Sequence, residues 1–262
     1  MIDMHILKMK GFRRLIIGLV VGLAGSMGVF GQKGIKMGML VLPQRTWMLN
    51  RDDQAAPQDQ FNYKSTHGMA AGLMVGYNFR DGVGFRLNPI YSAQGQKHTN
   101  LNQEDSLITH TRRLNYLKVP LFISFNTGTA NSKLIFVADL GLQANFLLSA
   151  RYYNDDKSYR PDDILFNPNV KDYPSPYKQY AHFGFGPVAS AGVGIKLGEN
   201  VMANISIRGD YQLSDAENKD ARYSLYTAGT PEEVKFYGAD RPATHNLAAG
   251  IMLGITYTFT EL

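Results

Sequence analysis

The sequence predicts an all-β fold: an eight-stranded antiparallel transmembrane β-barrel with short periplasmic turns and long extracellular loops. Three observations predict it. Apolar and polar residues alternate with a period of two in eight stretches of the chain. The connections between these stretches are alternately short and long, as in outer-membrane barrels. The 15 Tyr, 14 Phe and 26 Gly suit an aromatic-rich β-protein better than a helical one.

Composition excludes several other classes of protein. With 44% hydrophobic and 19% charged residues, the chain is too apolar and too weakly charged to be disordered. The absence of cysteine excludes a disulfide framework, a thiolate metal site and a cysteine nucleophile. A single apolar run approaches the length of a membrane-spanning helix, which excludes a polytopic helical membrane protein.

The N-terminal segment has the pattern of a secretory signal peptide. An apolar run over 15–30 follows four basic residues, and Val29 and Gly31 fit the small-residue positions of a cleavage site. We therefore predict a cleaved signal peptide over 1–31 and a barrel domain over 32–262, with an uncleaved anchor helix as the alternative. Cleavage removes four basic residues and one acidic residue and lowers the formal charge from +5 to +2, so no nucleic-acid partner is expected. The four basic residues are Lys8, Lys10, Arg13 and Arg14.

The last predicted strand shows the alternation most clearly. From Leu247 to Phe259 the odd positions are apolar and the even positions are small or polar. The same pattern recurs seven times, and no comparable stretch has the apolar spacing of a helix. The predicted strands cover 34–48, 66–79, 82–97, 108–126, 134–149, 180–197, 201–213 and 247–259.

The connections indicate which way the barrel faces. Tight turns are expected at 80–82, 127–131 and 198–200, where Gly supplies unusual backbone angles. An even number of strands then places both termini on the periplasmic side, so that the longer connections face the cell exterior. These long connections are expected near 49–65, 98–107, 151–179 and 214–243.

A soluble β-sandwich also alternates, but two details favour the membrane. The polar face carries small and charged residues that suit a narrow lumen, whereas the other face carries large aliphatic residues along the strands. Aromatic residues gather at the strand ends of the apolar face, as in the two interfacial girdles of a barrel. Those near the short turns are Tyr77, Phe79, Phe85, Phe125, Phe136, Tyr257 and Phe259, and those toward the long loops are Tyr91, Phe146, Phe183 and Tyr211.

One predicted strand resembles a known family. The run Leu-Asn-Tyr-Leu-Lys-Val-Pro-Leu at 114–121 resembles the "YLEIPL" strand of the PorT-like outer-membrane β-barrel family, and 140–150 resembles the strand that follows it. The resemblance covers nearly the whole mature chain and implies an outer-membrane barrel connected with secretion machinery. Lys118 departs from the acidic residue usual in this motif, so a lumen ion pair of the family does not carry over unchanged.

Six charged residues of the predicted strands face the lumen by this alternation. An eight-stranded barrel is just wide enough for side chains to fill, and unpaired charges there are costly, so these residues are predicted to pair across it. The result is a rigid polar plug or, as the alternative, a selective pore. The six are Arg86, Lys118, Asp139, Lys196, Arg208 and Asp210.

No catalytic, cofactor or metal site is predicted. Ser149 and Ser190 have no evident base partner, and no G-x-S-x-G motif is present, which leaves an outer-membrane enzyme as the less favoured class. The alternation would turn His98, His110 and His182 inward at the outer mouth, and a transition-metal site formed by them is a weaker alternative. Three acidic pairs lack calcium-loop spacing and are expected to be solvated: Asp52-Asp53, Asp155-Asp156 and Asp162-Asp163.

The long loops are the more promising place for function. They are rich in tyrosine, which offers a large contact area with a polar tip, although the same residues could only pack over the barrel mouth. We therefore predict a non-enzymatic scaffold or binding subunit of an envelope or secretion-associated complex. Its partners would be outer-membrane lipid and another envelope protein; a small pore or transporter is the alternative. The candidate binding surface is Tyr152, Tyr153, Tyr159, Tyr173, Tyr177, Tyr226 and Tyr237.

Overall fold

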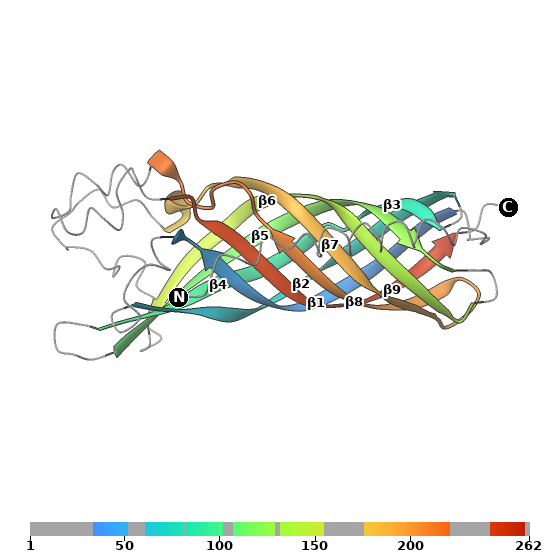
Figure 1. The fold of residues 1–262 in the computed structure, drawn as a ribbon, viewed down its shortest axis with the longest axis horizontal. Helices are drawn as coiled ribbons and strands as arrows, with labels where there is room; N and C mark the ends of the chain where they lie inside the picture. The colour runs from blue at the N-terminus through green and yellow to red at the C-terminus, as the bar shows by residue number, and fades with distance from the viewer. Residues whose placement is uncertain are drawn as a thin grey trace, which may run out of the picture.

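The barrel is formed by one antiparallel sheet (Figure 1). The computed structural model describes residues 34–51, 61–80, 82–101, 107–128, 132–154, 176–220 and 242–259, so the predicted signal peptide lies outside the described part. The strands in this part are β1 (Gly34–Leu49), β2 (Phe61–Arg80), β3 (Val83–Leu87), β4 (Ile90–Leu101), β5 (Leu107–Asn126), β6 (Leu134–Asn154), β7 (Phe183–Lys196), β8 (Val201–Tyr211) and β9 (His245–Phe259), with a 3-10 helix, η2 (Pro176–Gln179).

The sheet closes on itself through its first strand. Met39 of β1 lies opposite Leu73 of β2 on one side and opposite Ile255 of β9 on the other. The short strands β3 and β4 share one position in the ring, because both pair with β2 on one side and with β5 on the other. The ring therefore has eight strand positions, which confirms the predicted fold.

A proline divides the third strand position. The sequence predicts one strand over 82–97, but the ladder is interrupted at Asn88 and Pro89 because proline has no N–H to donate. The backbone nevertheless stays in the sheet: Leu73 N donates to Pro89 O at 3.0 Å, and Asn88 N donates to Pro120 O at 3.3 Å. A Cβ on Gly72 would collide with the Pro89 carbonyl oxygen, so this close approach requires glycine.

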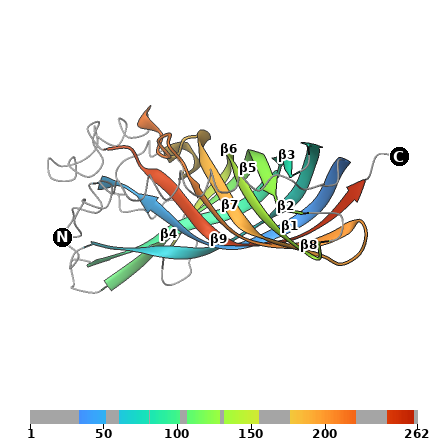
Figure 2. The ribbon, with the colours of Figure 1, turned by 45° about the vertical axis from the view of Figure 1, so that its right-hand side comes forward.

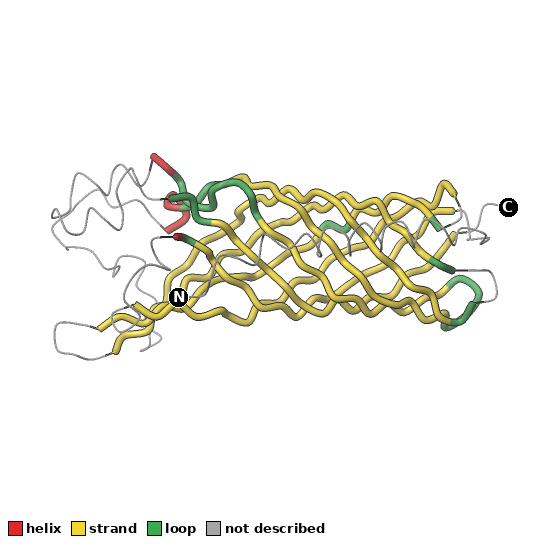
Figure 3. Tube along the Cα trace, in the orientation of Figure 1, coloured by secondary structure: helices red, strands yellow, loops and turns green. Residues whose placement is uncertain are grey.

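Several strands are longer at the loop end than the alternation predicts. Pairing of β2 with β4 begins at Phe61 and Asn100, and pairing of β5 with β6 reaches Asn154. Figure 3 shows these paired strands continuing past the loop end of the barrel. Beyond the membrane both faces of a strand meet water, so the apolar alternation stops although the backbone ladder continues.

Large apolar side chains cover the outer wall. In β9 the exposed positions are Ile251, Leu253, Ile255, Tyr257 and Phe259, while the alternate side chains turn inward. All the aromatic residues predicted near the short turns are at least 39% exposed. At the loop end Tyr91, Phe146 and Phe183 are also exposed, and Tyr211 is half-buried. This wall matches the apolar band and aromatic girdles of a membrane barrel.

The two ends of the barrel differ in construction (Figures 1 and 2). The short connections after β2, β5 and β7 lie at the same end as the end of β9. The end of β6, the residues that follow β8 and η2 lie at the opposite end. In the described part of the chain, no helix has the length and hydropathy needed to cross a membrane.

Candidate functional site: the barrel lumen and its outer mouth

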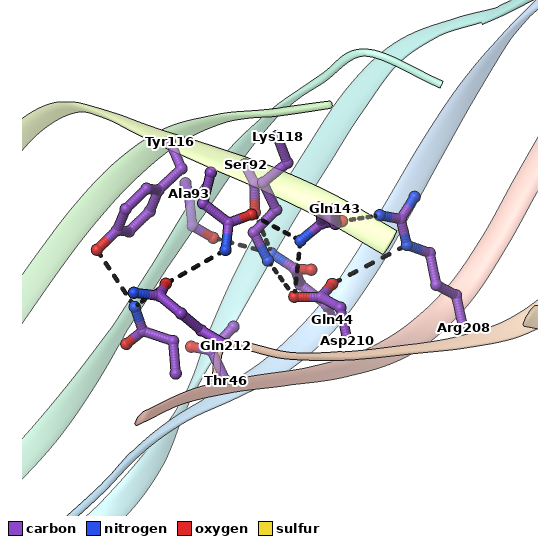
Figure 4. A network of polar contacts seen from close by, with 12 residues as sticks. Gln44, Thr46, Ser92, Ala93, Tyr116, Lys118, Gln143, Arg208, Asp210 and Gln212 are labelled. Carbon is purple, nitrogen blue, oxygen red and sulfur yellow. Dashed lines mark hydrogen bonds and ion pairs between the residues drawn. The ribbon is translucent and has the colours of Figure 1, made fainter. Parts of the chain in front are cut away.

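A buried ion pair lies across the middle of the lumen (Figure 4). Lys118 Nζ of β5 donates to Asp210 Oδ1 of β8 at 2.5 Å, and the exposed fractions of the two side chains are 1% and 4%. Gln143 of β6 donates from Nε2 to the same Asp210 oxygen at 3.3 Å and accepts from Arg208 Nη2 at 2.5 Å. Arg208 Nε also lies 4.0 Å from Asp210 Oδ2. Three strands are thereby joined through their side chains.

The polar chain continues from this pair toward the outer mouth. Gln143 Nε2 donates to Asn145 Oδ1 at 2.7 Å, and Asn145 Nδ2 donates to Gln212 Oε1 at 3.2 Å. The same Gln212 oxygen accepts from Asn246 Nδ2 at 3.1 Å, and Asn246 Nδ2 also lies 3.2 Å from the Tyr116 hydroxyl oxygen. Because these side chains come from β5, β6, β9 and the residue after β8, the chain braces the barrel from several sides.

A second ion pair joins β3 to β6. Arg86 Nη1 donates to Asp139 Oδ2 at 3.0 Å, and Arg86 Nη2 donates to Ser124 Oγ at 3.2 Å. Ser190 of β7 donates to the same Asp139 oxygen at 2.6 Å. No base partner for Ser190 was evident in the sequence, and the structure places the Asp139 carboxylate directly opposite it in the ladder of β6 and β7. The carboxylate is buried and already paired with Arg86, so this contact fixes structure rather than activating the hydroxyl.

A third polar group joins β1 to β2 and β4. Gln44 Nε2 donates to Ser92 Oγ at 2.8 Å, and the hydroxyls of Thr46 and Thr66 are 2.9 Å apart. Thr46 Oγ1 also lies 2.9 Å from the carbonyl oxygen of Gly95. These residues were not among the predicted site residues, although their positions on the polar face could have indicated them.

Bulky side chains fill the lumen between the polar groups. The Arg208 guanidinium lies over the Phe122 ring, with Cζ 5.7 Å from the ring centre. Lys118, Arg208 and Phe122 are each only 1% exposed, so no water-sized space adjoins them at this level of the barrel. One apolar cluster is formed by Leu40, Leu42, Ala70, Met74, Ile90 and Met252. The described lumen is therefore a solid interior at mid-height.

Lys196 lies at the short-turn end of the barrel, on β7. With Lys36 it lines an open pocket of about 30 Å³, which is room for about one water molecule. Asn126, Asn200 and Glu199 line the same pocket. Of the six predicted lumen charges, the structure thus brings Lys118, Arg208 and Asp210 into one group and Arg86 and Asp139 into another.

A folded cap, which we define as residues 176–182 and 212–217, packs against the outer end of the barrel. Tyr180 pairs with Glu217 in an isolated antiparallel bridge, and Ala181 N donates to Ala216 O at 2.9 Å. Asp215 Oδ1 accepts from the backbone N–H groups of Glu217 at 3.1 Å and Thr244 at 3.0 Å. The Tyr180 side chain is 1% exposed and belongs to the cluster of Met48, Leu114, Tyr116 and Leu147.

Only one tyrosine of the predicted binding surface has a described side chain. Tyr177 is 37% exposed, lies stacked against His182 with ring centres 4.4 Å apart, and donates to Leu147 O at 3.3 Å. Tyr177 therefore packs onto the barrel rim with part of its ring still accessible. The side chains of Tyr152 and Tyr153, and the whole of Tyr159, Tyr173, Tyr226 and Tyr237, lie outside the described part of the chain.

The structure describes only some of the histidine and acidic residues considered as metal ligands. His182 was predicted to turn inward but is exposed at the rim, because it precedes β7 and strand parity does not govern it. The side chains of His98 and His110 lie outside the description, as do the three acidic pairs of the loops. Among the described residues, no three His, Asp or Glu side chains are grouped so that they could hold a metal ion.

Comparison with solved structures finds other outer-membrane barrels at low identity. Outer Membrane Protein W of E. coli is 14% identical, with 88% of this chain and 100% of that chain covered and a TM-score of 0.42. OprG of Pseudomonas aeruginosa is 13% identical, with 89% and 100% covered and a TM-score of 0.40. Neisserial surface protein A is 11% identical, with 88% and 100% covered and a TM-score of 0.44. Scores this low carry no functional inference.

The sequence itself gives the assignment. It matches no curated protein. The family model described as "Outer membrane protein beta-barrel domain" matches residues 32–218, which is most of the chain. The matched range covers β1 to β8 of the closed ring, together with the buried ion pairs inside it. The chain therefore belongs to the outer membrane protein beta-barrel domain family, and its location is the cell outer membrane.

Proposed function

We propose that this protein is a non-enzymatic scaffold or binding subunit of an envelope complex, and that it engages its partner through the outer end of the barrel. The observation that carries the proposal is the filled lumen. Lys118, Arg208 and Phe122 occupy the middle of the barrel with 1% exposure each, so a solute has no path beside them. A barrel that does not conduct has its working surfaces on the outside.

The folded cap supports a binding role for the loops. It is held to the barrel by Tyr180 and by hydrogen bonds that reach Thr244, the residue before β9. The predicted tyrosine-rich loops, 151–179 and 214–243, both include residues of this cap. An anchored base lowers the entropy that a loop loses on binding, which favours affinity.

The resemblance of 114–121 to the PorT-like strand supports a place near secretion machinery. In this chain the position that is usually acidic in that motif is Lys118, whose partner is Asp210. This chain therefore has a buried positive charge, that of Lys118, at the position where the motif usually has a negative one. Fold and family alone do not specify a partner, and the secretion role is part of the proposal.

The test is gentle purification of the full chain from its own membranes in mild detergent, with mass spectrometry of the co-purifying proteins. We expect a partner in fixed stoichiometry. A variant with 157–173 replaced by a short Gly-Ser linker should lose it and still fold, because Pro176–Gln179 and Tyr180 remain in place. A matched variant with 223–239 replaced shows which loop is used. A partner retained by both variants, or a wild-type protein that always purifies alone, would contradict the proposal.

A further inference from the structure

Five basic side chains stand on the outer wall of the barrel at its loop end. We name them the outer basic patch: Arg45, Lys64, Lys97, Arg113 and Arg151. All five are exposed. They come from β1, β2, β4, β5 and β6, which are neighbours around the ring.

The ladder places like charges directly opposite each other within this patch. Lys64 of β2 lies opposite Lys97 of β4, and Arg113 of β5 lies opposite Arg151 of β6. Directly opposed residues share a face and lie close together, so each pair is repulsive by itself. The residue of β4 opposite Arg113 is Gly95, so no side chain of β4 stands between Lys97 and Arg113 on this face.

Acidic partners are scarce on these strands. Across β1 to β6 the only Asp or Glu is Asp139, and it points into the lumen toward Arg86. The described outer faces of β7, β8 and β9 carry no Lys or Arg at the same end; their side chains there include Phe183, Tyr211 and Ala249. On the described strands, the exposed basic side chains of this end therefore lie on one side of the barrel.

The patch lies directly above the apolar wall. Arg113 is four residues beyond the exposed Leu117 on the same face of β5, and Lys97 is six beyond the exposed Tyr91 on β4. With the rise and tilt of barrel strands, these offsets correspond to heights of roughly 10 and 15 Å above those residues. Lipid headgroups occupy this zone, and long basic side chains reach down into it.

We propose that the outer basic patch binds the phosphate groups of anionic lipid headgroups in the outer leaflet. Phosphate oxygens accept hydrogen bonds from ammonium and guanidinium groups and relieve the repulsion between Lys64 and Lys97. A lipid is favoured over a soluble anion because its acyl chains would lie along the apolar wall immediately below the patch. The protein then has one lipid-binding side, over β1 to β6, and one side free of this contact.

The test is native mass spectrometry of the detergent-solubilised full chain with added diphosphorylated lipid A, and with phosphatidylcholine as the zwitterionic comparison. We expect lipid A to bind, and the double variant Lys64→Gln/Lys97→Gln to bind it about 20- to 30-fold more weakly. The matched control is Lys178→Gln/Lys219→Gln, which removes two exposed charges outside the strands and should bind as the wild type does. Phosphatidylcholine should bind all three proteins equally.

A charge reversal separates lipid binding from folding. Lys97→Glu places a carboxylate opposite Lys64, so the unfolding temperature should be unchanged or higher while lipid A binding is lost. Undiminished lipid A binding by Lys97→Glu or by the double glutamine variant would overturn the proposal. It would also be overturned if the wild type bound phosphatidylcholine as tightly as lipid A, or if excess inorganic phosphate displaced the lipid completely.

Discussion

At the scale of single residues, the ion pair of Lys118 and Asp210 is the contact on which the closed lumen most depends. Both charges are almost fully buried, and Gln143 supplies a further hydrogen bond to the carboxylate. Removing one member of such a pair leaves an uncompensated charge in a medium that solvates it poorly, whereas replacing both members is often tolerated.

Lys118→Met should therefore destabilise the protein by about 3–5 kcal/mol. The double variant Lys118→Met/Asp210→Leu should recover most of that loss, because no unpaired charge remains in the lumen. Urea unfolding in detergent, followed through the fluorescence of the single tryptophan, Trp47, measures both. Equal stability of Lys118→Met and the wild type would show that the pair is not needed for the packed interior.

The pairing of the buried charges could not be predicted from the sequence. The alternation indicates which side chains face inward, but not which charges meet. Arg86 and Asp139 are 53 positions apart, and Lys118 and Asp210 are 92 apart. Their pairing depends on how far each strand is displaced along its neighbour around the ring, and a local pattern does not encode this displacement.

At the scale of elements, the break between β3 and β4 is held by a close approach of backbone to backbone. Gly72 lies against the Pro89 carbonyl and Ile90, with no room for a Cβ. Gly72→Ala should destabilise the barrel by roughly 1–3 kcal/mol. Gly198→Ala is the control, because nothing lies within 4 Å of its added Cβ, and it should be silent. Equal melting temperatures for the two variants would contradict this account of the break.

The attachment of the cap to the barrel can be tested in the same way. Tyr180→Ala removes a fully buried ring from the cluster at the mouth and should release the cap from the barrel. Trypsin should then cut faster after the exposed Lys178, as seen by mass spectrometry of the fragments. Tyr177→Phe, which loses only the hydroxyl contact with Leu147, should be cut at the wild-type rate. An unchanged rate for Tyr180→Ala would mean that Tyr180 does not anchor the cap.

The strand ends could be predicted only approximately, for a physical reason. Alternation arises where one face meets lipid and the other meets the lumen, and it disappears where both faces meet water. The paired ends of β2, β4 and β6 extend into that zone and were predicted as loops, whereas the start of β5 was predicted to within one residue. The cap was also not foreseen, because Tyr180 and Glu217 are brought together by the closed ring and not by any local motif.

At the scale of the whole molecule, the barrel combines three surfaces. The wall is apolar and faces lipid, the lumen is filled by ion pairs and bulky side chains, and the outer end carries the cap and the outer basic patch. The closed ring followed from period-two alternation and alternating loop lengths, because few other folds satisfy both. Because the lumen is filled, its side chains stabilise the barrel, and binding takes place at the outer surfaces.

The central claim is that the lumen is closed, and conductance across a planar lipid bilayer tests it most directly. The purified full chain should insert without producing conductance steps. The triple variant Lys118→Ala/Arg208→Ala/Phe122→Ala, if it folds, should produce small steps, because it removes the side chains that fill the middle of the barrel. Reproducible, uniform steps from the wild-type protein would contradict the closed lumen and identify the protein as a pore.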